Sequence, residues 1–117
     1  MRVSVLMTTA AVLAAACSSA SGPLGGGGGG RTTSLTVGND FFTPTPDTIS
    51  AGQTATWTWN SGGRSHNVTF EDGQNTSPTQ GSGTHQRTFS NAGTFRYRCT
   101  IHSTTFGGGM SGTIVVQ

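Results

Sequence analysis

Apolar and polar residues alternate in several short stretches of the chain between residue 35 and its end. The clearest stretch is residues 54–59, where Ala55, Trp57 and Trp59 take every second position and threonines take the positions between them. A period of two predicts a strand with one face in the core and one toward solvent, as in antiparallel sheets. Alternation or a short apolar run also predicts strands at residues 35–37, 65–70, 84–89, 93–99 and 113–116.

The same alternation places two chemically reactive side chains on core-facing positions. Every second residue from His66 to Phe70 falls on one face, together with the apolar residue at 68. In residues 93–99, every second residue from Phe95 to Cys99 likewise falls on one face. Side chains two residues apart on a strand share a face, so we predict that His66 and Cys99 both point inward near strand ends.

The remaining stretches are predicted to be loops and turns. Residues 41–46 hold two prolines, and residues 71–83 are polar and rich in turn formers, so we expect a loop and a surface excursion there. No stretch shows sustained helical periodicity. Six to eight short strands in a domain of about 87 residues, with frequent turns between them, predict an all-β fold of the β-sandwich type.

The first 30 residues differ in composition from the rest. Residues 1–16 carry one positive charge and then an apolar run ending in alanines, which predicts a signal peptide. Cys17 follows these small residues as in a bacterial lipobox, where the cysteine is diacylated; ordinary cleavage after an Ala-x-Ala site is the alternative. Residues 17–30, rich in serine and glycine, predict a flexible tether. We therefore expect an exported domain over residues 31–117, periplasmic or at the cell surface, with a lipid at Cys17 as its only membrane contact.

Charge and cysteine content reduce the number of function classes that remain possible. From Arg31 onward five arginines oppose four acidic residues, and the absence of lysine leaves no basic stripe for nucleic acid. An exported protein lies where disulfides form, yet Cys99 has no partner if Cys17 is lipidated or removed. Binding a metal would protect this single thiol.

Four side chains in the domain form a ligand set suited to copper. His66, Cys99, His102 and Met110 supply two imidazoles, a thiolate and a weak thioether, the set found in copper electron-transfer sites. His102 follows Cys99 by three residues and Met110 precedes the last strand, so one loop at the end of the fold would bring them together. If His85 joined the other two histidines and Cys99, the four would instead suit tetrahedral zinc.

The sequence around these residues resembles the cupredoxins, and within them the plastocyanin-like branch, over residues 35–117. The motifs that carry the resemblance are Gly52 with Thr56-Trp57, SHNVTF at 65–70, GTFRYRCTIH at 93–102 and GMSGTIVV at 109–116. The resemblance implies a Greek-key β-sandwich with one type 1 copper, with His66, Cys99 and His102 as equatorial ligands and Met110 as the axial ligand. It also implies that Asn67 ties the two ligand-bearing segments together by hydrogen bonds near the cysteine sulfur. Residues 103–109 make this loop longer than is common in plastocyanin-like proteins.

The resemblance further implies an electron carrier and not an enzyme. Copper would cycle between Cu(II) and Cu(I), taking electrons from one redox protein and passing them to another, of cytochrome or oxidase type, in the cell envelope; we expect a monomer. The electron would leave through the ring edge of His102, with Phe106 and the nearby glycines as the docking surface. Three histidines are too few for the additional copper of nitrite reductases or oxidases. Two alternatives remain open, a copper carrier without an electron-transfer role and a zinc-stabilised structural lipoprotein.

Overall fold

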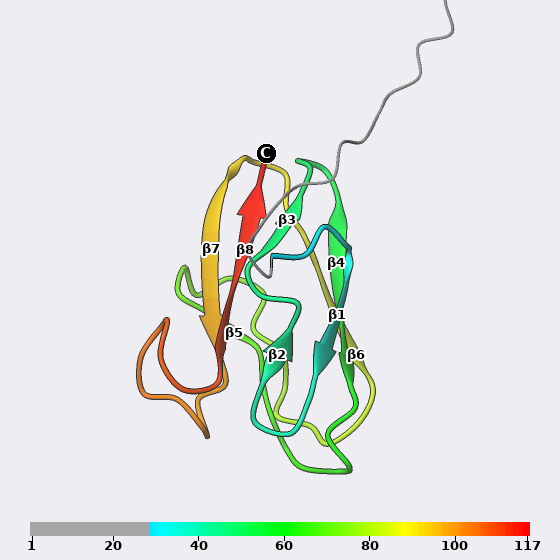
Figure 1. Cartoon of the computed structure of the whole chain (residues 1–117), viewed down its shortest axis with the longest axis vertical. Helices are drawn as coiled ribbons and strands as arrows, with labels where there is room; N and C mark the ends of the chain where they lie inside the picture. The colour runs from blue at the N-terminus through cyan, green and yellow to red at the C-terminus, as the bar shows by residue number, and fades with distance from the viewer. Residues whose placement is uncertain (1–28) are drawn as a thin grey trace, which may run out of the picture.

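The computed structural model describes residues 29–117, which form eight short strands and no helix (Figure 1). The strands are β1 (Ser34–Val37), β2 (Phe42–Thr43), β3 (Asp47–Ile49), β4 (Thr54–Trp59), β5 (Thr69–Phe70), β6 (Thr84–Thr88), β7 (Gly93–Arg98) and β8 (Ser111–Val116). Two four-stranded sheets, in the orders β2-β1-β4-β6 and β3-β8-β7-β5, pack face to face. The predicted all-β sandwich of six to eight strands is confirmed, and this part of the chain offers no helix that spans a bilayer.

Both sheets are mixed and not purely antiparallel. β1 runs parallel to β4, with Leu35 opposite Trp57, and β3 runs parallel to β8. The pairs β4–β6, β5–β7 and β7–β8 are antiparallel. The expectation of an antiparallel sheet around residues 54–59 is therefore right for one neighbour of β4 and wrong for the other. Alternation of side chains follows from the pleat of a single strand and carries no information on the direction of its neighbour.

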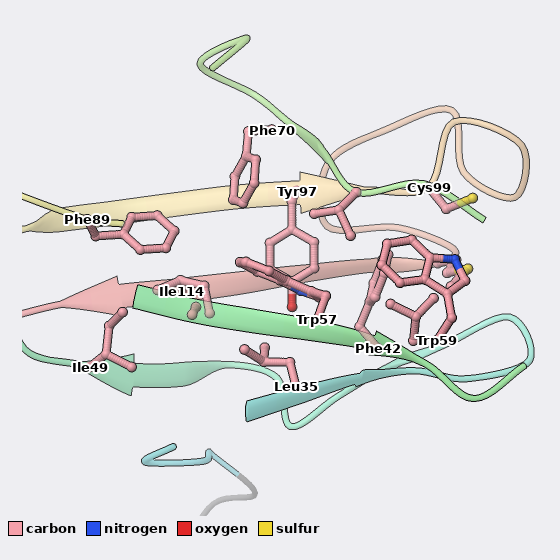
Figure 2. Close-up of a cluster of buried hydrophobic side chains, with 14 of the residues drawn as sticks. Leu35, Phe42, Ile49, Trp57, Trp59, Phe70, Phe89, Tyr97, Cys99 and Ile114 are labelled. Carbon is pink, nitrogen blue, oxygen red and sulfur yellow. The ribbon is translucent and has the colours of Figure 1, made fainter. Parts of the chain in front are cut away.

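Aromatic side chains fill the space between the sheets (Figure 2). The ring of Trp57 packs edge-on against Tyr97, with ring centroids 5.3 Å apart, and against Phe70 at 5.5 Å. Tyr97 packs against Phe42 at 4.9 Å. Such pairs contribute about 0.5–1.5 kcal/mol each beyond the burial of the rings. The same cluster includes Cys99, so the apolar core extends directly to the predicted ligands.

One stretch that was expected to be a loop forms a short strand. Phe42–Thr43 pairs antiparallel with β1, and Phe42 lies opposite Val37. The side chain of Phe42 is buried. Burial of this ring holds the backbone against the sheet, although the prolines that follow end the strand within two residues.

The stretch of residues 65–70 is only partly a strand. Thr69–Phe70 forms β5, whereas His66 makes an isolated bridge with Gln80. The segment 71–83 therefore contributes to the fold and is not only a surface excursion, since Ser77 is buried and hydrogen-bonds to the backbone of Val68. These bonds support the segment that carries His66.

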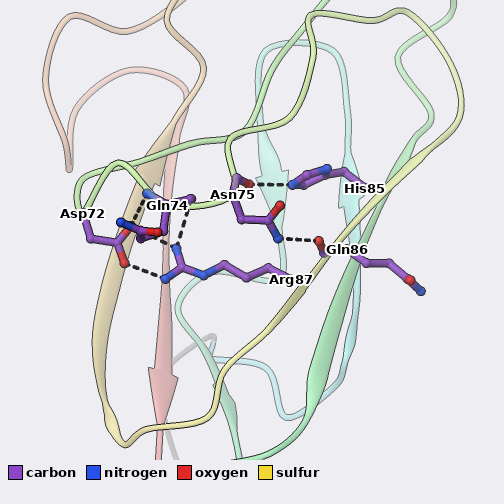
Figure 3. Close-up of polar contacts among 6 residues, drawn as sticks. All are labelled: Asp72, Gln74, Asn75, His85, Gln86 and Arg87. Carbon is purple, nitrogen blue, oxygen red and sulfur yellow. Dashed lines mark hydrogen bonds and ion pairs between the residues drawn. The ribbon is translucent and has the colours of Figure 1, made fainter.

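Arg87 of β6 is a buried charge that links this polar segment to the core (Figure 3). Its guanidinium carbon lies 4.2 Å from the ring centre of Phe70 and 4.8 Å from that of Phe89. The two terminal nitrogens donate to the two carboxylate oxygens of Asp72. The hydrogen bonds from Arg87 lower the pKa of Asp72 below its ordinary value. The pair fixes the start of the 71–83 segment against the sandwich.

The described chain joins the sandwich at Gly30. Its amide donates to the carbonyl of Pro46 and its carbonyl accepts from the amide of Thr48, both at 2.9 Å. A β-carbon at this position would lie 2.6 Å from a carboxylate oxygen of Asp47, so a side chain has no room here. The predicted signal peptide, residues 1–16, and the predicted lipid attachment at Cys17 lie outside the described residues.

Candidate metal centre

Cys99 and two histidines meet at one end of the sandwich. Cys99 directly follows β7, His102 lies in the next loop, and His66 lies shortly before β5. The Nδ1 atoms of the two histidines are 3.0 Å apart. The Cys99 Sγ atom lies 3.8 Å from Nδ1 of His66 and 3.6 Å from Nδ1 of His102. The structure thus brings together the three side chains predicted to be the strong ligands.

These separations suit one shared metal ion. A point in the plane of the three atoms lies about 2.0 Å from each, close to the bonds of about 2.0 Å to imidazole and about 2.3 Å to thiolate that zinc makes in proteins. Two imidazoles and one thiolate are the donor set of copper electron-transfer sites. Within residues 29–117 the group has no fourth histidine, cysteine or carboxylate.

His66 is fixed by backbone hydrogen bonds on both sides. It exchanges two backbone bonds of 3.0 Å with Gln80, and its carbonyl accepts a bond of 3.2 Å from Nε1 of Trp59. The imidazole is fully buried. Burial, followed by the nearby His102, lowers the pKa of His66. A lower pKa favours the neutral ring, which is the form that binds a metal.

Asn67 joins the segment that carries His66 to the one that carries Cys99. Its Oδ1 atom accepts from the amide of Thr100 at 3.0 Å, and its Nδ2 atom donates to the Thr100 hydroxyl at 2.8 Å. The hydroxyl of Thr69 donates to the same Oδ1 atom at 2.9 Å. Since Asn67 is buried, water does not compete strongly for these bonds. The network sets the distance between the two ligand-bearing segments.

Met110 returns to the same end of the fold after the long loop. Its carbonyl accepts from the amide of Cys99 at 2.9 Å, and its amide donates to the carbonyl of His102 at 3.4 Å. Its side chain is buried and belongs to the core cluster. The backbone of Met110 is therefore hydrogen-bonded directly to Cys99 and to His102. It returns to them although seven residues separate His102 from Met110.

The loop of residues 103–109 is ordered by its own polar groups. The Ser103 hydroxyl is within hydrogen-bonding distance of the carbonyls of Thr105 and Gly108. Arg98 donates to the carbonyl of Ser103, and its guanidinium lies 5.1 Å from the ring centre of Phe106. Phe106 is half-buried in this contact, so it supports the loop in addition to any part it has in docking.

His85 lies apart from the ligand group. It belongs to β6, and its Nε2 atom is 2.7 Å from the carbonyl of Asn75 (Figure 3). It is absent from the group formed by His66, Cys99 and His102. A tetrahedral zinc site that uses His85 as the fourth ligand is therefore not formed in this fold.

Sequence reasoning missed Asp40, which lies beside His102. Its Oδ1 atom is 3.4 Å from Nε2 of His102, the ring nitrogen on the far side from the other ligands. The run Gly38-Asn39-Asp40 signals a turn. A predicted turn does not show which other loop it will contact, so the contact between Asp40 and His102 could not be predicted from the sequence.

Comparison with known proteins identifies the family of the chain. The model of copper-binding proteins of the plastocyanin/azurin family matches residues 31–117. The plastocyanin of Scenedesmus fuscus is 34% identical over 88 residues, which cover 65% of this chain and 86% of that protein. A purple cupredoxin from Nitrosopumilus maritimus has a TM-score of 0.60 at 21% identity, over 72% of this chain and 98% of that one. The oxidised plastocyanin of Dryopteris crassirhizoma also has a TM-score of 0.60, at 24% identity, over 72% and 99%. The chain therefore belongs to the plastocyanin/azurin family of copper-binding proteins, and the predicted cofactor, one copper ion, is the metal of that family.

Proposed function

We propose that the protein carries single electrons between two redox proteins of the cell envelope and has no catalytic activity of its own. In this proposal His66, Cys99 and His102 are the equatorial ligands of a type 1 copper and Met110 is its axial ligand. The observation that carries the proposal is the convergence of two Nδ1 atoms and one Sγ atom to within 3.8 Å of one another. Bound copper supplies a reversible Cu(II)/Cu(I) couple.

The protein's contribution is to hold the ligands in nearly fixed positions. His66 is bonded to Gln80, and Asn67 is bonded to Thr100 next to Cys99. These bonds use backbone and amide groups and leave the ligand nitrogens and sulfur free to bind the ion. A preformed site limits the rearrangement that accompanies each change of charge, which favours rapid transfer in both directions.

The axial role of Met110 is supported by its place in the chain and in the core. Its backbone bonds to Cys99 and His102 hold it at the metal end, and its side chain is shielded from water. A buried thioether is a weak ligand that interacts with copper without displacing the stronger imidazoles and thiolate. The strength of this interaction is one of the factors that set the potential.

The exit for the electron is proposed to be His102. Its side chain is 24% exposed, whereas His66 and Cys99 are fully buried. The exposed large apolar side chains of residues 29–117 are Phe41 and Ile101, which are neighbours of Asp40 and His102 in the chain. We therefore add Phe41 and Ile101 to the docking surface predicted from the sequence. A small apolar contact of this kind suits a brief redox encounter.

The location and partners rest on the sequence. The apolar residues 1–16 and the cysteine at 17 support export and a lipid anchor. The glycine-rich stretch that follows supports a tether that lets a monomeric domain reach donor and acceptor proteins of cytochrome or oxidase type.

The proposed centre is tested by optical and EPR spectra of the copper-loaded protein. An intense visible band from thiolate-to-copper charge transfer is expected, with the small copper hyperfine coupling of a type 1 site. Cys99→Ser should remove the band, whereas Cys17→Ser should leave it. A colourless protein that holds zinc after purification and rejects copper would contradict the proposal.

A second experiment separates an electron carrier from a copper carrier. An electron carrier should reversibly oxidise a reduced cytochrome, whereas a copper carrier should transfer its metal to a copper-free acceptor.

A further inference from the structure

The carboxylate of Asp40 lies between the exposed edge of His102 and an arginine. Its Oδ1 atom is 3.4 Å from Nε2 of His102. Its Oδ2 atom is 3.4 Å from a terminal nitrogen of Arg64. Each carboxylate oxygen therefore has its own partner. Three loops, those after β1, after β4 and after β7, meet at this carboxylate.

The backbone holds Asp40 in this place. The turn between β1 and β2 is closed by a bond of 2.8 Å from the amide of Gly38 to the carbonyl of Phe41. Asp40 occupies the left-handed region of the backbone map, with φ of 70°. Asp and Asn are among the few residues with a side chain that adopt this conformation readily. The turn thus presents the carboxylate in a defined direction toward His102.

The orientation of the His102 ring determines which of its nitrogens faces Asp40. Nδ1 of His102 faces His66 and Cys99. When Nδ1 binds a metal, the ring proton resides on Nε2, which faces Asp40. Carboxylates that accept this second proton orient metal-binding histidines and raise the basicity of the coordinating nitrogen.

We propose that Asp40 is a positioning residue for the copper ligand His102 and that Arg64 moderates its effect. Asp40 directs the ring and makes Nδ1 a stronger donor, which stabilises Cu(II) more than Cu(I) and so lowers the reduction potential. Arg64 draws part of the carboxylate charge to itself and works in the opposite direction. The inference rests on the proposed electron-transfer function, since it requires copper on Nδ1 of His102.

Asp40→Asn tests the role of the carboxylate. Asparagine has the same shape and tolerates the left-handed conformation, so the turn is retained. Loss of a hydrogen-bonding partner of a metal ligand typically weakens metal binding by 10- to 100-fold. Because Asp40 is 45% exposed, we expect the low end of this range, an affinity for Cu(II) about tenfold weaker with little change for Cu(I). That ratio corresponds to a rise in the potential of about 59 mV.

Two matched variants separate this effect from a general loss of charge. Glu71→Gln removes a carboxylate of similar exposure, 44%, that pairs with Arg96 and does not contact His102. It should leave the potential nearly unchanged. Arg64→Gln frees the second oxygen of Asp40 and should lower the potential.

NMR spectra of the diamagnetic Cu(I) protein give a readout that does not depend on electron transfer. The Nε2 proton of His102 should exchange more slowly with water in the wild type than in Asp40→Asn. Equal shifts of potential in Asp40→Asn and Glu71→Gln, or a rise of potential in Arg64→Gln, would overturn the inference. A wild-type protein without a type 1 spectrum would instead overturn the proposed function, so the two failures are distinguishable.

Discussion

The Nδ1 atoms of His66 and His102 lie 3.0 Å apart, although 36 residues separate the two histidines in the chain. Two imidazole nitrogens at this distance are close enough to bind one ion together. The fold fixes this spacing through the backbone bonds of His66 to Gln80 and the bond of Asn67 to Thr100. Preorganisation of this kind reduces the free-energy cost of binding the ion.

Replacement of Met110 by leucine is expected to keep the colour of the copper protein and raise its potential. The thioether is a weak donor that stabilises Cu(II) more than Cu(I), and leucine removes it. The volumes are similar, so the free energy of unfolding of the metal-free protein should change by less than about 1.5 kcal/mol. Voltammetry and the optical spectrum measure the two effects. An unchanged potential would show that Met110 is not an axial ligand.

Asn67→Ala is expected to lower the free energy of unfolding of the metal-free protein by about 2–3 kcal/mol. The substitution removes the bonds to Thr100 and Thr69 and a bond of 3.1 Å to the hydroxyl of Thr79, and it leaves buried polar groups without partners. Denaturant titration measures the loss. Asn91→Ala, at an exposed loop position, should stay within about 0.5 kcal/mol of the wild type. Equal losses in the two variants would be inconsistent with the network.

Gly109→Ala should disturb the metal end more than Gly107→Ala. Both glycines have positive φ, 57° and 94°, so both variants carry backbone strain of about 1–2 kcal/mol. A β-carbon at Gly109 would lie 2.7 Å from the carbonyl of His102, whereas one at Gly107 would meet no atom within 4 Å. Only the first should shift His102 and alter the EPR parameters. Identical spectra for the two variants would contradict this expectation.

Asp72→Asn should destabilise the protein at neutral pH and have less effect in acid. Arg87 holds the pKa of Asp72 below its ordinary value of 3.8. The ionised carboxylate therefore adds stability above about pH 4, and this stability is lost as the pH falls through the depressed folded pKa. We expect a loss of about 1 kcal/mol at pH 7, because the carboxylate is 36% exposed and partly screened. Unfolding free energies of both proteins from pH 7 to pH 2 should converge; a constant difference would rule out the linkage.

Electron exchange with a partner should depend only weakly on salt. The domain from Arg31 onward has a net charge close to neutral, and the exposed residues beside His102 include Phe41 and Ile101. The charges of Asp40 and Arg64 at this edge have opposite sign and pair with each other. Screening acts on charges, so the second-order rate constant should change by less than about threefold between low and physiological ionic strength. Stopped-flow mixing with a reduced cytochrome measures it. Ile101→Ser should slow the reaction at every salt concentration, and a steep salt dependence would point to a charged docking surface.

Most of the strands, though not β2 and β3, and the grouping of the three strong ligand candidates could be predicted because they follow from local pattern. Alternation in residues 54–59 reflects a pleat that the residues themselves define, and Trp57 and Trp59 are buried. Cys99 continues the inward face of its strand, and His102 is close enough in sequence to stay at the same end. The parallel direction of β1 against β4 could not be predicted, because pairing direction depends on chain connections and not on side-chain period.

The contacts of Asp40 and Arg87 could not be predicted from the sequence, for a different physical reason. Asp40 meets His102 only because three loops of different origin end at the same pole of the sandwich. Arg87 is buried because three-dimensional packing supplies both aromatic faces and the carboxylate of Asp72. A charged residue at that position is normally read as solvent-exposed. Such contacts depend on the tertiary structure and not on the local sequence.

The docking of Gly30 against β3 has a mechanical consequence. Its bonds to Pro46 and Thr48 place the entry of the chain on the edge strand β3, beside β8. Tension applied on the amino-terminal side of Gly30 would be transmitted first into that edge. β8 lies between β3 and β7, the strand that leads to Cys99 and His102. A pull on the leading end of the domain would thus strain the pairing of β3 with β8 before it reached the strand that carries these ligands.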